Sequence, residues 1–121
     1  MSIETNKAIA RRFVQVWGKG DPSILDELAS ADIGVWYPLM PAPTQGIDAF
    51  KEVLGMVHTA MPDIECETGD LVAEGDLVVA PWTLSATHLG DLMGIPATGR
   101  KVQWTETGIL RVADGKVVES W

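Results

Sequence analysis

The last third of the chain alternates between apolar and polar residues in three successive runs. These runs span residues 76–88, 100–112 and 116–121, and turn-forming or glycine-rich segments separate them. Side chains of a β-strand point alternately to its two faces, so this period of two is typical of strands that cover a core on one side. We therefore predict three consecutive strands that form an antiparallel meander.

In the first two runs, one face is more apolar than the other and is expected to point inward. The inward residues are Val78, Ala80, Trp82, Leu84, Ala86 and His88 in the first run, and Val102, Trp104, Glu106, Gly108, Leu110 and Val112 in the second. Each face carries one ionisable side chain among apolar neighbours. A histidine and a glutamate on tryptophan-rich inward faces are typical of a pocket with acid–base chemistry.

The first half of the chain shows helical spacing of its apolar residues. Ser2 is a suitable N-cap for a first helix that runs to about Gly18. Asp21 and Pro22 supply the cap and first residue of a short second helix. A third helix is predicted from Ile47 to Met61, where Pro62 ends it, so three helices precede the meander.

Short strands and a proline-rich loop lie between these helices and the meander. We predict a strand over residues 33–37, an irregular loop over 38–46 because three prolines interrupt it, and a strand or pair of short strands over 63–73. This order predicts an α+β fold, in which a curved antiparallel sheet packs on three helices. Such a fold leaves a cone-shaped cavity between sheet and helices, open at one end.

Composition narrows the class of protein. A chain of 121 residues fits one domain, residues 1–121, with a core of its own. The net charge of -8 argues against nucleic acid or an anionic membrane as partner, since both attract clustered Lys and Arg. Cys66 is the single cysteine, so no intramolecular disulfide forms. With no signal peptide or apolar segment of membrane-spanning length, a cytoplasmic protein is expected.

Glu106 is the leading candidate for proton transfer. Apolar neighbours on an inward face would raise its pKa, and Gly108 on the same face would leave room for a ligand. The alternative is an ordinary solvated carboxylate at a wet rim. His88 is interpreted as a general acid or hydrogen-bond donor, or alternatively as a residue that anchors the following loop. His58, on the third helix, is expected at the edge of the buried stripe.

The remaining candidates would contact an apolar ligand. The loop over residues 89–99 carries apolar side chains that close over a pocket or, alternatively, form a dimer contact. No phosphate-binding loop, metal-ligand pair or nucleophile elbow is present, so we expect neither cofactor nor metal. The expected ligand-contacting residues are Trp17, Trp36, Tyr37, Met56, Trp82, Met93, Trp104 and Gly108; for the tryptophans the alternative is a place in the core or at an interface.

Several motifs resemble the SnoaL-like polyketide cyclase family of the NTF2-like superfamily. The most distinctive are Gly94-Ile-Pro-Ala-Thr-Gly-Arg100 and Gly115-Lys-Val-Val-Glu-Ser-Trp121, and the resemblance spans nearly the whole chain. It implies a cystatin-like α+β barrel that forms a homodimer through its outer sheet face. It also implies a cofactor-free intramolecular aldol cyclisation of an apolar or aromatic carbonyl compound, in which a carboxylate removes a proton beside a carbonyl.

The chain departs from the family pattern at one position. Many relatives carry an aspartate three residues before the arginine that matches Arg111, whereas this chain has Gly108. Glu106 lies two residues earlier on the same strand face, and its longer side chain is expected to act instead, with His88 as electrophilic helper. The alternatives are another proton-transfer enzyme, such as an isomerase or epoxide hydrolase, a non-catalytic ligand-binding module, or a dimerisation domain with a collapsed cavity.

Overall fold

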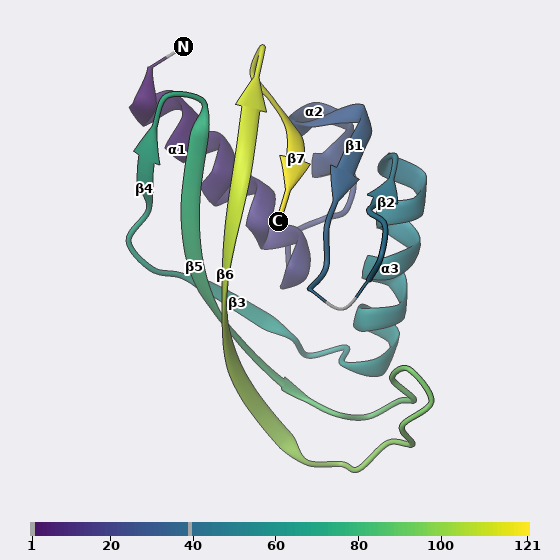
Figure 1. The fold of residues 1–121 in the computed structure, drawn as a ribbon. Coiled ribbons are helices and arrows are strands. Elements are labelled where there is room, and N and C mark those ends of the chain that lie inside the picture. Colours follow the sequence, from purple (N-terminus) through teal and green to yellow (C-terminus); the bar gives the residue numbers. More distant parts are fainter. Residues whose placement is uncertain (1, 39) are drawn as a thin grey trace.

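A computed structural model describes residues 2–38 and 40–121; Met1 and Leu39, the latter in the predicted proline-rich loop, lie outside the described residues. The helical elements are α1 (Ile3–Phe13), the 3-10 helix η1 (Val14–Trp17), α2 (Ile24–Leu28) and α3 (Ile47–Ala60). The strands are β1 (Ala29–Val35), β2 (Thr44–Gln45), β3 (Glu65–Thr68), β4 (Val72–Glu74), β5 (Leu77–Thr87), β6 (Lys101–Ala113) and β7 (Lys116–Ser120) (Figure 1).

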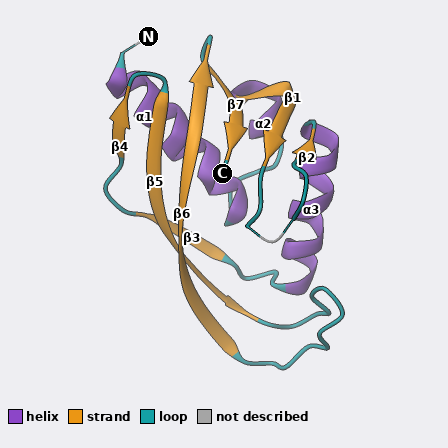
Figure 2. Cartoon of the chain, viewed as in Figure 1, coloured by secondary structure: helices purple, strands orange, loops and turns teal. Residues whose placement is uncertain are grey.

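The strands form one curved sheet with the order β2-β1-β7-β6-β5-β3, and β4 pairs with the remaining part of β5. The predicted meander of β5, β6 and β7 is confirmed, with β5 and β6 paired from Leu77↔Arg111 to Thr87↔Lys101. The sheet is not wholly antiparallel as predicted, because β1 and β7 run parallel. These strands are distant in sequence, so no hairpin constrains their direction. The result is a mixed, unclosed α+β sheet (Figure 2).

The helices cover one side of the sheet and build the core with it. In Figure 1, α1 crosses behind β5 and β6, while α3 stands beside β1 and β2. Ser2 caps α1 as predicted, since its hydroxyl oxygen accepts a hydrogen bond from the Thr5 backbone N–H at 3.0 Å. Phe13 of α1 and Phe50 of α3 are fully buried, with ring centroids 5.9 Å apart. The two helices therefore meet at an aromatic contact beneath the sheet.

Two boundaries differ from the prediction. The first α-helix ends at Phe13 and tightens into η1, and β1 spans residues 29–35 rather than 33–37. The tight packing of Gly18 explains the turn after η1, because a Cβ there would lie 2.6 Å from the backbone nitrogen of Cys66. Gly18 is thereby packed directly against β3. Among the described residues, no helix combines the length and apolar character that crossing a membrane requires.

Candidate functional site

The inner face of β5 is the one predicted. Val78, Ala80, Trp82, Leu84 and Ala86 are all buried, and the intervening residues are only partly so. Directly paired residues of antiparallel strands point to the same face. Because Trp82 pairs with Glu106 and Leu84 with Trp104, Glu106 and Trp104 share this inner face. The predicted orientation of Glu106 is therefore confirmed.

The burial of β6 changes abruptly along its length. Gly108, Leu110 and Val112 are buried, whereas Val102 and Glu106 are exposed and Trp104 is half-buried. β7 pairs with the end of β6 from Leu110, and the ladder continues only to Ile109. No described strand borders this edge of β6 over residues 101–108. We call the inner face of β6 from Val102 to Glu106, which β7 leaves uncovered, the β6 recess.

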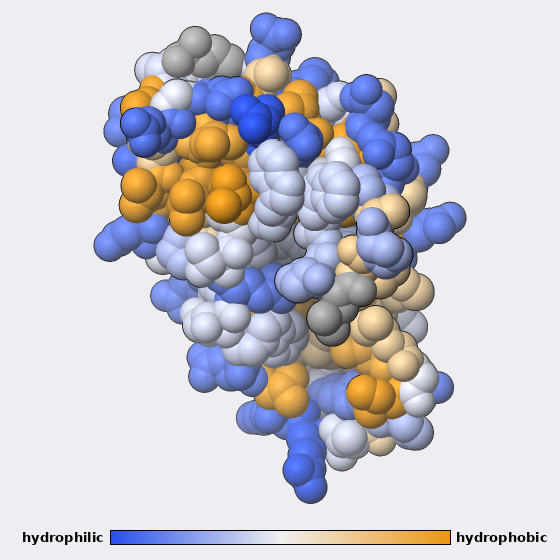
Figure 3. Space-filling view, viewed as in Figure 1, coloured by the Kyte–Doolittle hydropathy of each residue, from blue (hydrophilic) through white to orange (hydrophobic). Residues whose placement is uncertain are grey.

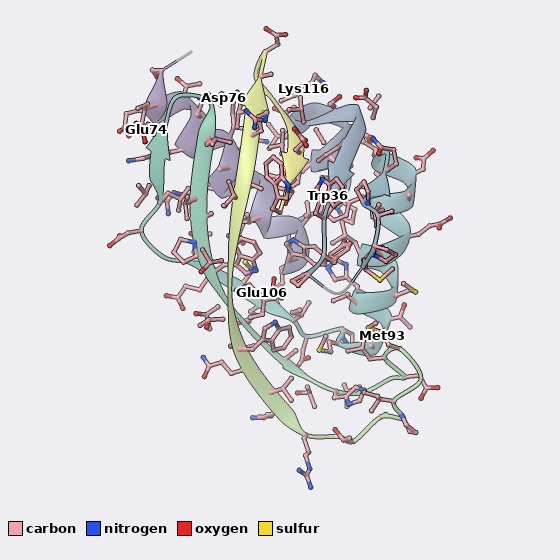
Figure 4. All side chains as sticks on the ribbon, viewed as in Figure 1. Trp36, Glu74, Asp76, Met93, Glu106 and Lys116 are labelled. Carbon is pink, nitrogen blue, oxygen red and sulfur yellow. The ribbon has the colours of Figure 1, made fainter. Side chains whose placement is uncertain are left out.

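The predicted desolvation of Glu106 is wrong, because its side chain is exposed in the β6 recess. The carboxylate is nevertheless held in place: the Trp104 indole N–H donates a hydrogen bond to Glu106 Oε1 at 2.9 Å. Such a bond fixes the orientation of the carboxyl group. In Figure 4, Glu106 lies halfway along β6, far from Met93 in the loop after β5.

Two protonated side chains lie close enough to Glu106 to sense its charge. Burial, together with a smaller effect of the negative charge of Glu106, raises the pKa of the Tyr37 phenol to about 12 and that of the Cys66 thiol to about 11. Desolvation and a neighbouring anion each disfavour a second negative charge. The site therefore places the Glu106 carboxyl group near a phenol that stays protonated at neutral pH.

Aromatic rings form the helix-side wall beside Tyr37. The Trp17 ring meets Tyr37 edge-on at 6.5 Å between centroids and meets Phe50 at 5.5 Å. The Tyr37 hydroxyl oxygen is buried and has no hydrogen-bond partner among the described residues. An unpaired buried polar group is costly, so a hydroxyl in this state is a candidate donor to a bound molecule.

Trp82 occupies the space above Gly108. A Cβ built on Gly108 would lie 2.6 Å from Trp82 Cη2 and 2.9 Å from Cζ3, which is closer than carbon atoms approach. Gly108 thus leaves room for the Trp82 ring, and not directly for a ligand as its predicted role requires. This pairing was not visible from sequence, since the two residues meet diagonally across β5 and β6.

His88 stands at the far end of the same face. Its Nδ1 lies 3.1 Å from the Thr98 hydroxyl, and its backbone pairs with Gly99 and Arg100, so it anchors the loop as the alternative interpretation holds. Its Nε2 is buried without a partner among the described residues. Six residues separate Trp82, the partner of Glu106, from His88, which is about 20 Å of strand. The structure does not bring His88 and Glu106 together.

Three residues expected to contact a ligand lie elsewhere. Ile33 and Val35 turn inward from β1, so Trp36 lies on the outer face, 39% exposed and over Gly34. Met56 is 60% exposed on the solvent side of α3, and Met93 is 90% exposed at the loop tip. None of the three lies on the inner face of β5 or β6, and their contact with a ligand stays a prediction.

His58 and the loop over 89–99 lie beside the end of α3. The Leu89 and Gly90 backbone N–H groups both donate to the Ala60 carbonyl oxygen, which ties the loop to this helix end. His58 is half-buried, and its Nε2 is buried without a partner among the described residues. Over residues 2–38 and 40–121, no three His, Cys, Asp or Glu side chains group as metal ligands would.

Sequence reasoning missed Cys66 as a member of the site. Its position opposite Leu84 places it on the inner face, and its strand alternates exposed and half-buried residues. The same alternation was available in the sequence, where Cys66 and Thr68 oppose Glu65 and Glu67. The proximity of Cys66 to Glu106 could not be predicted from the sequence, because it depends on the curvature of the sheet, which brings β3 and β6 around the same interior.

The raised pKa of Cys66 predicts slow alkylation at neutral pH. The thiolate is the reactive form, so iodoacetamide labelling should rise with pH around a midpoint of about 11 rather than 9. Over this interval the unfolded chain loses the proton before the folded chain does, so stability falls as pH rises. Mass spectrometry of timed labelling reactions measures the midpoint.

Two variants test the stated causes of that midpoint. Glu106→Gln removes the nearby negative charge and should lower the midpoint, while burial still holds it above 9. Glu74→Gln, at an exposed position of β4, should leave it unchanged. A midpoint near 9 in the unaltered protein would contradict the described environment of Cys66.

Comparisons with known proteins agree with this architecture. The model of the SnoaL-like polyketide cyclase family matches residues 7–121. The aklanonic acid methyl ester cyclase of Streptomyces peucetius is 26% identical over 117 residues, covering 95% of this chain and 81% of that protein.

Solved structures show the same fold. A candidate hydroxylase of Streptomyces galilaeus is 32% identical, with a TM-score of 0.85 over 99% of this chain and 74% of that one. A candidate polyketide cyclase of Streptomyces antibioticus is 27% identical, with a TM-score of 0.79 over 96% of this chain and 88% of that one. A SnoaL-like protein of Jannaschia, 22% identical, has a TM-score of 0.88 over 99% of this chain and 86% of that one, and supports the fold alone.

Proposed function

Because the chain belongs to the SnoaL-like polyketide cyclase family, we propose that it is a cofactor-free acid–base enzyme that closes a ring in an apolar carbonyl compound by intramolecular aldol condensation. The observation that carries this proposal is the Glu106 carboxylate, which the Trp104 indole N–H holds on the inner face of the sheet near the buried Tyr37 hydroxyl. The similarity to an aklanonic acid methyl ester cyclase supports a carbonyl compound as the substrate class.

Glu106 is the proposed base. Its carboxylate takes a proton from the carbon beside a ligand carbonyl, and the resulting enolate carbon forms a bond to a second carbonyl carbon of the same molecule. The alkoxide oxygen produced at that second carbonyl then receives a proton, so no redox partner is needed. The Trp104 N–H keeps the carboxylate oriented during transfer.

Tyr37 is the proposed donor to the enolate oxygen. Its hydroxyl is buried without a protein partner in the described residues, and its pKa of about 12 keeps it protonated at neutral pH. A donor aimed at developing negative charge stabilises the transition state more than the ground state. Because His88 lies about 20 Å of strand away, we assign its free Nε2 to the distant end of a ligand and not to the reacting carbonyl.

Hydrogen–deuterium exchange tests the proton transfer directly. 2-Tetralone, a ring-fused aromatic ketone with acidic protons beside its carbonyl, is incubated with the protein in deuterated buffer and followed by mass spectrometry. We expect exchange about 10²–10⁴-fold faster than in buffer alone, the usual contribution of a positioned base. Exchange at the buffer rate, with the ketone shown to bind, would overturn catalysis and favour the second candidate.

That second candidate is a non-catalytic ligand-binding domain. Two observations favour it: Glu106 is exposed, and position 108 has no side chain to offer. Ring closure is also not the only chemistry described among similar structures, since one is a candidate hydroxylase. A binding domain predicts a measurable affinity for aromatic ketones without accelerated exchange.

We also propose that the protein is a homodimer formed through the outer sheet face. Exposed apolar residues gather there on neighbouring strands, and Figure 3 shows apolar surface over the upper part of the sheet. Monomers rarely expose such contiguous patches. The residues are Trp36, Val72, Ile109 and Trp121.

Placing a charge in this patch should dissociate the dimer. Ile109→Lys puts an ammonium group at the centre of the proposed contact, where burial without a partner is costly. Sedimentation velocity should give a dimer for the unaltered protein and a monomer for the variant. Thr59→Lys, exposed on α3, is the matched control and should remain dimeric. A monomeric unaltered protein would refute the assignment.

A further inference from the structure

Trp82 and Gly108 lie in close contact on the inner face of the sheet. The ring of Trp82 lies where any side chain at position 108 would begin, with Cη2 at 2.6 Å and Cζ3 at 2.9 Å from the place of its Cβ. Trp82 is only 6% exposed, so its ring is fixed by packing. The indole therefore fills volume that another residue at position 108 would claim.

The orientation of the indole follows from the atoms that touch Gly108. Cζ3 and Cη2 form the outer edge of the six-membered ring, and Nε1 belongs to the five-membered ring on the opposite side of the bicycle. The N–H group therefore points away from Gly108. Nε1 is buried and has no hydrogen-bond partner among the described residues, although indole N–H groups usually find one when buried.

Trp82 also lies at the boundary between core and recess. On one side of it, Ala80 pairs with Gly108, and both are buried; on the other, Leu84 pairs with the half-buried Trp104. Trp82 itself pairs with the exposed Glu106. On β6, burial ends between Gly108 and Glu106, and the indole lies beside this point, although Leu84 and Ala86 of β5 stay buried beyond it. We call the part of the indole that a molecule in the β6 recess would meet the floor.

We propose that Trp82 is a specificity-determining residue, whose ring limits the depth of the ligand site and whose N–H donates a hydrogen bond to a ligand oxygen. This inference rests on the proposed function, because it concerns the carbonyl compound that Glu106 would act on. It adds a size limit: of two fused-ring aromatic carbonyl compounds, the site binds the shorter one more tightly. The unpaired N–H places the preferred oxygen at the inner end of the ligand.

Two ketones of different length test the size limit. Equilibrium dialysis measures the dissociation constants of 2-acetylnaphthalene and 2-acetylanthracene, which differ by one fused ring. The unaltered protein should bind the two-ring ketone at least about 10-fold more tightly than the three-ring ketone. One extra methylene that does not fit a pocket already changes discrimination between ligands by about 10–200-fold. Trp82→Ala removes the floor and should reverse this preference.

A second substitution keeps the test decisive if Trp82→Ala does not fold. Trp82→Phe retains an aromatic ring but lacks the outer edge that covers Gly108 and lacks the N–H. It should shift the preference partway towards the longer ketone and weaken binding of the shorter one. Trp104→Phe makes the same exchange at a residue that contacts Glu106 and is not part of the floor. This variant should weaken the binding of both ketones by a similar factor.

The outcomes separate this inference from the function on which it rests. If the unaltered protein binds the ketones and the Trp82 variants keep the same preference between them, Trp82 does not determine specificity, and the proposed function stands. If the unaltered protein binds neither ketone, the proposed function and the inference both fail. A reversed or shifted preference in the Trp82 variants alone supports the inference.

Discussion

Gly108→Asp is expected to destabilise the protein by about 3 kcal/mol or more. Overpacking of a filled site costs about 1–3 kcal/mol, and the new Cβ would lie 2.6 Å from the ring of Trp82. Burial of an unpaired carboxylate adds to that cost. Urea denaturation followed by circular dichroism measures the change as a lower midpoint with little change in slope.

A double-mutant cycle shows whether Trp82 causes this loss. Combining Gly108→Asp with Trp82→Ala removes the clashing ring, so the double variant should be more stable than the sum of the two single effects predicts. Residues in contact commonly show coupling energies of 0.5–3 kcal/mol. Additive effects would mean that Trp82 does not occupy the space a side chain at position 108 needs.

Glu106→Gln is expected to reduce exchange of 2-tetralone by about 10²–10⁴-fold, the range for loss of a general base. Glutamine has nearly the same shape and keeps an oxygen that accepts from the Trp104 N–H. Because the side chain is exposed, stability should change by less than about 0.5 kcal/mol. Exchange rates at saturating ketone separate loss of catalysis from loss of binding.

The matched control for this variant is Glu74→Gln. Glu74 is also an exposed glutamate on a strand, but it lies on β4 near the top of the sheet, apart from Glu106 (Figure 4). Exchange should be unchanged in this control. Equal rates for Glu106→Gln and the unaltered protein would remove Glu106 from the mechanism, and equal losses in both variants would point to a general effect of charge.

Local sequence pattern was sufficient for the main elements. The alternation over 77–87 predicted which side of β5 is buried, because side-chain direction in a strand depends only on parity. Helical spacing bounded by Gly46 and Pro62 likewise predicted α3 almost to the residue. The same parity correctly placed Glu106 and Trp104 on the inner face.

Pairings between distant segments were not predictable in the same way. The parallel contact of β1 with β7 joins residues about 85 positions apart, and no local preference selects its direction. This contact also decides the outward position of Trp36. Side chains alternate along β1, and because Ile33 and Val35 point into the core, Trp36 points away from it. A tryptophan favours burial in general but does not specify which face of a strand receives it.

The sequence by itself determined the α+β class, the inner face of the meander and the presence of one carboxylate on it. Only the tertiary structure decided that this carboxylate is exposed, because β7 stops pairing with β6 before reaching it. Only the structure brought Tyr37 and Cys66 near Glu106, separated His88 from it, and set the ring of Trp82 over Gly108. The physical reason is that parity is a property of neighbouring residues, whereas burial and proximity depend on which remote elements cover a surface.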